Sequence, residues 1–423
     1  FNLEWPDGGL IAVLGWPGQW AARFRGVDHG GVHLTGGQEL THFTLLPGEE
    51  VRTPRVVLQF WYGSRMRSQN VWRRWMRAHN SPHPDGKPVG PQFAGCSSWY
   101  FGEMINANDA NQKLFIDRYL EEGIKIDYWW MDAGWYINNG NWPNTGTWEV
   151  DLKRFPGGLR SITDHAHARG VRIIVWFEPE RVNPGTWLYT THPEWLLGSG
   201  DGDRLLNLGN DEARQWWIEH VNRILTEQGI DLYRTDFNID PLPFWRSADA
   251  PDRQGITEIR YVTGFLAYLD ELLRRRPNLL VDTCASGGRR NDIETLRRAV
   301  PLLRSDYLTE PVSQQLHTYG IAPWIPFYGT GVSGTDPYVF WSQACPHITG
   351  GWDVRRKDLD YPAIRAIIAE WRALSPLMLA DFYPLTAYDV GTDVWMGWQF
   401  HRPEDGKGMI LVFRRPASVY EAA

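Results

Sequence analysis

Two aspartates have the placement of catalytic carboxylates. Asp236 and Asp306 each close a segment that reads as a short strand. An ionised carboxylate gains nothing at the end of a buried strand unless it is paired, whereas catalytic residues of barrel proteins sit at the C-terminal strand ends. Two such groups could cleave a glycosidic bond, one attacking the anomeric carbon and one, kept protonated, serving the leaving oxygen. We interpret Asp236 as a nucleophile and Asp306 as its partner; the alternative is that both are scaffold groups paired with Arg234 and Arg304.

The neighbours of Asp236 favour the catalytic interpretation. Arg234 and Asn238 alternate with Asp236, so all three face the same side of an extended segment. A cation beside a carboxylate lowers its pKa and keeps it ionised, and both neighbours could hold sugar hydroxyls. Trp176 ends an earlier strand and could form a wall of a sugar pocket, while the role of Glu178 beside it stays open.

The segment 284–292 follows another strand and has three interpretations. Its paired glycines would let a ligand or a second loop approach the backbone closely. Asn291 and Glu294 have the spacing of a capping box, which would only start a helix. A phosphate loop would need a Gly-Lys-Ser/Thr ending that is missing, and Cys284 lacks the partnered histidine of a nucleophile.

The elements that must position these residues alternate between helix and strand. Amphipathic helices stop at Gly123, Gly170 and Gly229, where glycine supplies a left-handed C-cap, and each is followed by a strand with a polar end. This pattern predicts parallel βα units, with strands at 124–131, 171–177, 230–235, 279–283 and 302–304. A doubly wound sheet would carry a glycine-rich phosphate loop that is absent. We therefore predict an α/β protein with a (β/α)8 TIM barrel, its seventh and eighth strands at 322–327 and 339–344.

The ends of the chain are rich in β pattern instead. We predict an N-terminal β-sandwich portion with a linker, a catalytic barrel, and a short, incomplete C-terminal β region, at residues 1–85, 86–380 and 381–423.

Composition excludes several classes of function. The formal charge of −7 and the lack of any Lys/Arg-dense segment argue against nucleic acid, and no apolar run approaches the roughly 20 residues that cross a bilayer. His165 and His167 read as an exposed helix end, so we expect neither a metal nor a cofactor. The 24 tryptophans hint at carbohydrate, because indole rings offer flat apolar walls with a hydrogen-bond donor.

The three cysteines lie far apart, at positions 96, 284 and 345, which fits a reducing compartment better than a disulfide framework. There is no signal peptide, so we expect a cytoplasmic protein. The chain opens on Phe1 rather than methionine, which leaves room for residues upstream.

Five motifs occur in an order that resembles the bacterial α-galactosidases of glycoside hydrolase family 36, of the melibiase type. They are Met131-Asp132-Ala133-Gly134-Trp135, Trp176-Phe177-Glu178-Pro179-Glu180, Tyr233-Arg234-Thr235-Asp236-Phe237-Asn238, Cys284-Ala285-Ser286-Gly287-Gly288 and Arg304-Ser305-Asp306. The resemblance implies a barrel flanked by two β domains and a retaining, metal-free double displacement. Asp236 would be the nucleophile and Asp306 the general acid/base. The implied substrate is an oligosaccharide or glycoside, and a homo-oligomer is possible. The implied substrate-binding residues are Asp132, Trp176, Arg204, Arg234, Asn238, Cys284 and Gly287.

Two residues depart from the family's pattern. Ala133 stands where the family has a second aspartate for the sugar hydroxyls, which removes a charge-assisted hydrogen bond. Arg234 stands where the family has lysine, and arginine is bulkier and forks its donors. Galactose specificity is therefore open, with α-N-acetylgalactosaminidase, β-L-arabinopyranosidase or transglycosylase activity as alternatives. A carbohydrate-binding barrel without activity is disfavoured, because neither strand-end carboxylate is lost.

Overall fold

A parallel sheet closes around the centre of the molecule. The computed structural model describes residues 1–308 and 310–421. Seven strands pair in the order β15-β13-β9-β8-β7-β17-β16. They are β7 (Gln92–Cys96), β8 (Tyr128–Met131), β9 (Arg172–Phe177), β13 (Leu232–Thr235), β15 (Leu280–Thr283), β16 (Gly329–Val332) and β17 (His347–Gly350).

Residues 300–304 occupy the sixth position of the barrel and close it. Val300 N donates to Val281 O of β15 (2.9 Å), and Thr283 N donates back to Val300 O (2.9 Å). On the other side, Arg304 N donates to Gly329 O of β16 (2.9 Å). With this segment the ring has eight members, and the predicted (β/α)8 barrel is confirmed.

The predictions for the last two strands are wrong. Residues 339–344 fall almost wholly in α11 (Pro337–Gln343), where the Asp336 side chain accepts from Val339 N as the N-cap. Residues 322–327 form the turn that follows α10 (Pro311–Ile321). The true strands, β16 and β17, are poor in bulky apolar residues because the barrel is crowded there. A Cβ on Gly329 would lie 2.1 Å from Leu302 O.

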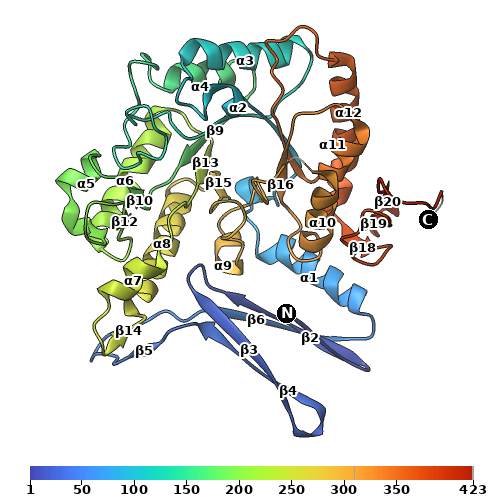
Figure 1. Cartoon of the computed structure of the whole chain (residues 1–423), viewed down its shortest axis with the longest axis horizontal. Helices are drawn as coiled ribbons and strands as arrows, with labels where there is room; N and C mark the ends of the chain where they lie inside the picture. The colour runs from blue at the N-terminus through green and yellow to red at the C-terminus, as the bar shows by residue number, and fades with distance from the viewer. Residues whose placement is uncertain (309, 422–423) are drawn as a thin grey trace.

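Helices surround the strands (Figure 1). The helices of the βα units are α3 (Asp109–Glu121), α4 (Arg160–His167), α6 (Asp211–Glu227), α8 (Ile256–Arg275), α9 (Ile293–Leu296), α10, α11 and α12 (Tyr361–Leu374). Asn108 starts α3 with a full capping box, and Gly123, Gly170 and Gly229 have φ values of +70°, +73° and +68°. The predicted helix ends therefore have the left-handed backbone that glycine permits.

The loops at the C-terminal strand ends carry further short elements. α2 (Ser98–Phe101) follows β7, and α7 (Leu242–Ala248) follows β13. A small three-stranded sheet with a short helix is inserted after β9, and we call it the excursion after β9. It is made of β10 (Arg181–Val182), α5 (Trp187–Thr191), β11 (Leu196–Leu197) and β12 (Arg204–Leu206).

Apolar side chains fill the lower part of the barrel. Ile174, Leu232 and Leu280 stand in register on neighbouring strands. Together with Trp130 and Leu302 they belong to one buried cluster inside the ring. A larger cluster packs between the strands and the outer helices. The rigid floor made by the inner cluster supports the polar side chains above it.

The N-terminal strands form their own layer beside the barrel (Figure 1). An antiparallel sheet joins β1 (Asn2–Trp5), β2 (Gly8–Gly15) and β6 (Arg55–Tyr62), and the hairpin of β3 (Trp20–Val27) and β4 (Gly31–Gln38) projects away from the rest. The short β5 (His42–Phe43) pairs with β14 (Arg253–Gln254) next to α8, and α1 (Arg65–His79) leads to the barrel.

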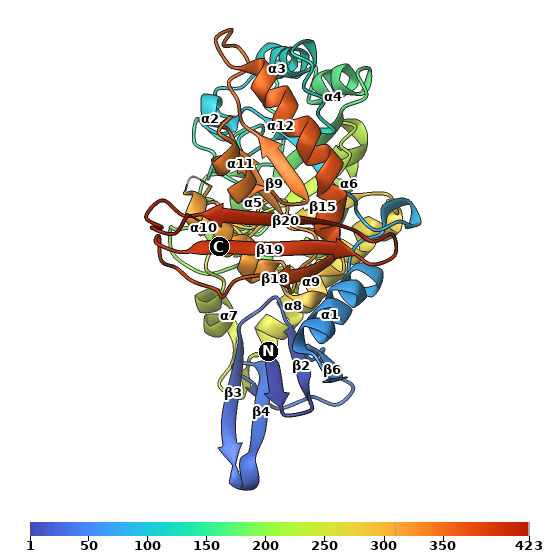
Figure 2. The ribbon, with the colours of Figure 1, turned by 90° about the vertical axis from the view of Figure 1, so that its right-hand side faces the viewer.

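Three C-terminal strands pack against α1, α11 and the 3-10 helix η4 (Ser375–Leu379), and they lie at the front in Figure 2. They are β18 (Asp381–Pro384), β19 (Trp395–Arg402) and β20 (Lys407–Arg414), joined antiparallel in that order. The division into domains at residues 85 and 380 stays a prediction.

Candidate active site

Two layers of polar side chains lie above the apolar floor of the barrel. Residues two apart on a strand face the same side, so the register of β9, β13 and β15 sets both layers. Asp236 N donates to Phe177 O (2.8 Å) and continues the ladder beyond the strand ends. The lower layer holds Trp176, Arg234 and Asp282, and the upper layer holds Glu178, Asp236 and Cys284.

Asp236 lies at the end of β13 with its carboxylate almost surrounded by donors. Its Oδ2 accepts from Trp176 Nε1 (3.1 Å) and Asn238 Nδ2 (2.9 Å), and its Oδ1 accepts from the backbone N–H groups of Phe237 (2.7 Å) and Ser286 (3.2 Å). Burial opposes ionisation, but the Arg234 charge and these hydrogen bonds outweigh it and lower the pKa of Asp236. Asp236 is therefore an oriented anion at neutral pH.

Arg234 lies beneath Asp236 and is buried. Its Nη1 pairs with the fully buried Asp282, and its guanidinium stacks over the Trp130 ring at 4.5 Å. Burial works against the charge, yet the surrounding anions, Asp282, Asp132 and Asp236 among them, hold the pKa of Arg234 well above its usual range. Arg234 thus acts on the carboxylates above it through its charge.

Asp306 lies at the end of the sixth barrel segment and is open to solvent. Its surroundings remove the carboxyl partly from water, which raises its pKa; Arg234 lowers it, and the Asp236 charge raises it further. The net pKa of Asp306 is raised. The two aspartates are therefore pushed in opposite directions, which is how acid and base roles are separated at one site.

Asp132 follows β8 on the same mouth. Its Oδ2 accepts from Trp130 Nε1 (2.7 Å) and its Oδ1 from Ala133 N (2.7 Å). Burial raises the pKa of Asp132 against the lowering effect of Arg234. Since both oxygens have other lone pairs, Asp132 can still accept from a ligand hydroxyl.

The loop after β15 closes one side of the site. Ser286 has a left-handed φ of +46° and Gly287 one of +87°, and a Cβ on Gly287 would lie 3.6 Å from Asp306 N. Ser286 Oγ donates to Asn238 Oδ1 (2.7 Å), and burial raises the pKa of Cys284 far above its usual value. The loop thus brings its backbone close to both aspartates, and Cys284 stays a neutral thiol.

Two predicted substrate-binding residues lie apart from the space between the aspartates. Trp176 lies behind the hydrogen-bonded cluster around Asp236, and Arg204 lies outside it. Trp176 is only 2% exposed and packs among Tyr136 and Trp142, so its main visible role is to donate to Asp236. Arg204 belongs to β12, where it donates to Gly200 O (3.2 Å) and stacks on Tyr189 at 4.7 Å. No hydrogen bond joins Arg204 to the carboxylates among the described residues.

Two glutamates after β9 hold the site from behind. Glu178 Oε1 accepts from Asn238 N (2.7 Å), and its Oε2 pairs with Arg181 (2.5 Å). Glu180 accepts two hydrogen bonds from Arg290 (2.5 and 2.7 Å). These contacts give Glu178 a structural role, because its carboxylate fixes the backbone at Asn238.

Sequence reasoning missed two residues at the mouth, Glu103 and Trp99. Both lie on the loop after β7, which carried no motif. Trp99 is 70% exposed and lies against Gly351, just beyond β17. Glu103 is half-buried, and the negative charges of Asp132 and Asp306 raise its pKa. The only sequence signal for this loop was its position after the first barrel strand.

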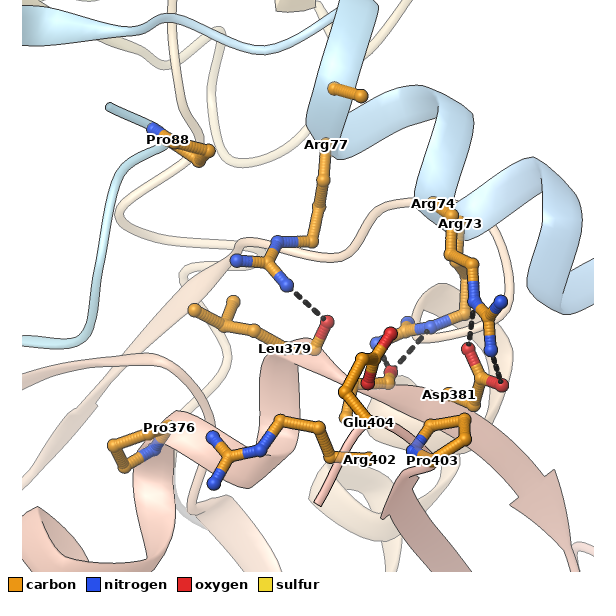
Figure 3. A pocket seen from close by; sticks show the side chains of 12 residues that line it. Arg73, Arg74, Arg77, Pro88, Pro376, Leu379, Asp381, Arg402, Pro403 and Glu404 are labelled. Carbon is orange, nitrogen blue, oxygen red and sulfur yellow. Dashed lines mark hydrogen bonds and ion pairs between the residues drawn. The ribbon is translucent and has the colours of Figure 1, made fainter. Parts of the chain in front are cut away.

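A separate pocket of about 460 Å³ lies away from the mouth (Figure 3). Three arginines of α1 line it, but Arg74 pairs with Asp381 (2.6 Å), Arg77 donates to Leu379 O (3.2 Å) and Arg73 donates to backbone carbonyls such as Ala380 O (2.7 Å). These guanidinium groups are used to join α1 to the C-terminal sheet, so the pocket is structural.

The described residues hold no group of three or more His, Cys, Asp or Glu side chains placed to bind a metal ion. No helix among them is long and apolar enough to pass through a bilayer.

A closed (β/α)8 barrel gathers catalytic residues at its C-terminal mouth, and paired carboxylates are the groups that glycoside hydrolases place there. Comparisons with known proteins agree. A crystal structure of an AgaA variant, a family 36 α-galactosidase from Geobacillus stearothermophilus in complex with stachyose, matches with a TM-score of 0.84 at 20% identity. The match covers 96% of this chain and 59% of that one, and it shows the shared fold.

The melibiase family model matches residues 99–332, which is more than half of the 423 residues, so the chain belongs to the melibiase family. The resemblance predicted from the five motifs is confirmed. AgaA itself is 26% identical over 299 residues, covering 68% of this chain and 40% of AgaA. Alpha-galactosidase 1 of Pediococcus pentosaceus is 24% identical over 332 residues, covering 73% of this chain and 45% of that protein. The chain thus matches less than half the length of either relative.

Proposed function

We propose that this chain carries the catalytic centre of a retaining α-glycosidase that hydrolyses terminal α-galactoside-like bonds. The observation that carries the proposal is the pair of aspartates with opposite pKa shifts at one barrel mouth. Asp236 has a lowered pKa and four donors on its oxygens. Asp306 has a raised pKa and no such donors among the described residues.

In the proposed reaction the two aspartates act in turn. Asp236 attacks C1 while Asp306 gives its proton to the leaving oxygen, which forms a covalent glycosyl-enzyme. Asp306, now ionised, takes a proton from the water that attacks C1, and Asp236 leaves. The four donors on Asp236 fix the direction of its oxygens in both steps. Glu178 and the loop after β15 hold those donors in place.

The remaining polar groups are proposed to hold the sugar. Asp132, Asn238 and the Gly287 backbone border the space between the two aspartates. Arg204 would reach it from the excursion after β9. Support for an oligosaccharide substrate comes from AgaA, whose structure is a complex with stachyose. A homo-oligomer stays a prediction.

Asp236→Ala and Asp306→Ala test the catalytic assignment. Each should lower kcat by about 10²- to 10⁴-fold or more on an unactivated galactoside. On an activated aryl galactoside, which needs little acid assistance, Asp306→Ala should keep a rapid first step and Asp236→Ala should not. Proton NMR of the first product should show the α-anomer, as double displacement requires.

Asp28→Ala, in the exposed end of the β3–β4 hairpin, is the matched control and should be as active as the natural chain. If Asp236→Ala keeps most of the activity while its circular dichroism is unchanged, the assignment of the nucleophile is wrong. A β-anomer as first product would refute the retaining mechanism.

Because position 133 is alanine and carries no second carboxylate, the sugar preference is tested further with a panel of sugars. Aryl α-glycosides of galactose, N-acetylgalactosamine and glucose, with the β-L-arabinopyranoside, separate galactosidase from α-N-acetylgalactosaminidase and β-L-arabinopyranosidase activity. Product analysis at high substrate concentration detects a transglycosylase. Binding without turnover on every sugar would identify a non-catalytic carbohydrate-binding barrel.

A further inference from the structure

Glu103 is a carboxylate at the barrel mouth that the proposed mechanism does not use. It follows α2 on the loop after β7, and it has a left-handed φ of +58° directly after Gly102 at +55°. A residue with a Cβ disfavours this conformation. Such outliers persist where the surrounding structure imposes them, often at ligand sites. What imposes it here is the connection of this loop to its neighbour.

The loop that carries Glu103 is joined to the loop that carries Asp132. Met104 N donates to Ala133 O (2.7 Å), and a Cβ on Gly134 would lie 3.1 Å from Ile105 N. Arg154 clamps both loops, because its guanidinium donates to the carbonyl oxygens of Met104 and Gly134. Glu103 and Asp132 are therefore held side by side by neighbouring backbone.

The carboxylate of Glu103 has no hydrogen bond or ion pair within the described part of the chain. The charged groups that act on it come from three elements: Asp132 after β8, Arg234 on β13 with Asp236 at its end, and Asp306 on the sixth segment. Cys96 at the end of β7 is a further titratable neighbour. Burial and then Asp132 raise the pKa of Glu103 to about 8, against Arg234. The group is half-buried and close enough to Asp132, Asp236 and Asp306 for their charges to raise its pKa.

The residue after Asp132 carries no carboxylate. It is Ala133, which is 2% exposed, so Asp132 stands without a paired acid on its own loop. We propose that Glu103 is the second sugar-binding carboxylate of this mouth, taking beside Asp132 the hydroxyl contacts that Ala133 cannot make. It thereby determines which pattern of ring hydroxyls is accepted. This inference rests on the proposed glycosidase function.

The chemistry fits a ring hydroxyl that both donates and accepts. A carboxylic acid can donate one hydrogen bond and accept others, and a carboxylate accepts only. Asp132 keeps free lone pairs beside it, so a hydroxyl can donate to Asp132 and accept from Glu103. A sugar that lacks a hydroxyl at this point would leave Glu103 unpaired on binding, which is costly.

Glu103→Ala, assayed on the four aryl glycosides named above, tests the role in specificity. For the preferred sugar we expect KM to rise about 2- to 10-fold, which is the worth of one hydrogen bond between uncharged groups, with kcat within a few fold. The ratio of kcat/KM between the preferred sugar and the poorest one should fall by a similar factor. Glu103→Gly gives the same test without the backbone strain, should the alanine variant not fold.

Glu103→Gln tests the titration of the same group. The natural chain should show a change in KM between pH 7 and pH 9 that the glutamine variant lacks. Glu50→Gln, at an exposed glutamate of the N-terminal region, is the matched control and should keep both the ratio and the pH dependence.

The inference is overturned if Glu103→Ala lowers kcat/KM for all four sugars by one common factor, or leaves all of them unchanged. It is also overturned if Glu103→Gln keeps the pH dependence of KM. Failure of the proposed function is a different result, in which the natural chain hydrolyses none of the four glycosides.

Discussion

At the scale of single residues, the mouth is organised around one buried cation. Arg234 lowers the pKa of each carboxyl around it, at Glu103, Asp132, Asp236 and Asp306. Among these four groups only Asp236 has a lowered net pKa, because its hydrogen-bond donors add to the effect of the charge. The contrast between Asp236, whose pKa is lowered, and the three carboxyl groups whose pKa values are raised therefore depends on this guanidinium.

Arg234→Gln should shift the acidic limb of the activity profile to higher pH. The Arg234 charge lowers the pKa of Asp236, so its removal raises that pKa, and Asp236 must be ionised to attack. The variant also leaves Asp282 buried without a partner, at a cost of about 3–5 kcal/mol. The pH dependence of kcat/KM and denaturant unfolding measure the two effects.

A double variant separates charge from stability. Arg234→Gln with Asp282→Asn removes both members of the buried pair and should recover most of the lost stability, while the acidic limb stays shifted. An acidic limb that returns with the stability would show that Arg234 acts only as scaffold.

At the scale of elements, the loops after three neighbouring strands are joined behind the site. Glu180, after β9, binds Arg290 of the loop after β15 and accepts from Tyr261 of α8 (2.5 Å). Arg290 in turn stacks over Phe237 at 3.9 Å, the residue beside Asp236. Substitutions in this chain of contacts should change the position of Asp236, the proposed nucleophile, although the substituted residues do not contact the substrate.

Glu180→Gln should destabilise the protein by about 3–5 kcal/mol, since Arg290 would be left as a buried, unpaired charge. It should lower kcat more than it raises KM, because Phe237 and Asp236 lose their support. Thermal unfolding and steady-state kinetics measure both. Glu227→Gln breaks the exposed pair with Arg223 (3.2 Å) on α6 and should change stability by no more than about 0.5 kcal/mol. Equal effects of the two variants would contradict this account.

At the scale of the whole molecule, ion pairs attach the N-terminal region to the barrel. Glu49 pairs with Arg253 (2.5 Å) and Arg260 (2.9 Å), next to the β5–β14 pairing. Trp16 Nε1 donates to Glu258 Oε1 of α8 (2.7 Å) and makes a second attachment. The domains predicted as separate are therefore linked through α8, which also supports Glu180.

The Glu49 attachment should weaken in acid. Its hydrogen bonds to Arg253 lower the pKa of Glu49 to about 2, from 4.5 in the unfolded chain. A lowered pKa contributes stability above the unfolded value, and this contribution is lost as the pH falls from about 4.5 to about 2. Hydrogen exchange of residues 42–44 and 252–255, corrected for intrinsic rates, should increase between pH 5 and pH 3. Glu49→Gln should show the increased exchange already at pH 5; no difference from the natural chain there would refute the link.

The sequence by itself determined the barrel and predicted the two aspartates as catalytic residues. Helix periodicity, glycine C-caps and polar strand ends are local properties, and each is decided by residues close in the chain. Asp236 could be recognised because an ionised carboxylate at the end of an apolar strand is costly to bury, so its presence there indicates a functional role. The last two strands could not be recognised, because Gly329 and Gly350 are small to fit Leu302 and Phe93, which lie far away in the sequence.

Only the tertiary structure decided how the mouth is charged. Alternation along the strand places Arg234 on the same face as Asp236, and only parallel register pairs it with Asp282, 48 residues away. Glu103 reaches the mouth because Met104 is hydrogen-bonded to Ala133, a contact that no local pattern encodes. The strength of a carboxylate depends on its distance from other charges and on its burial, and both are fixed only when distant strands close into one ring.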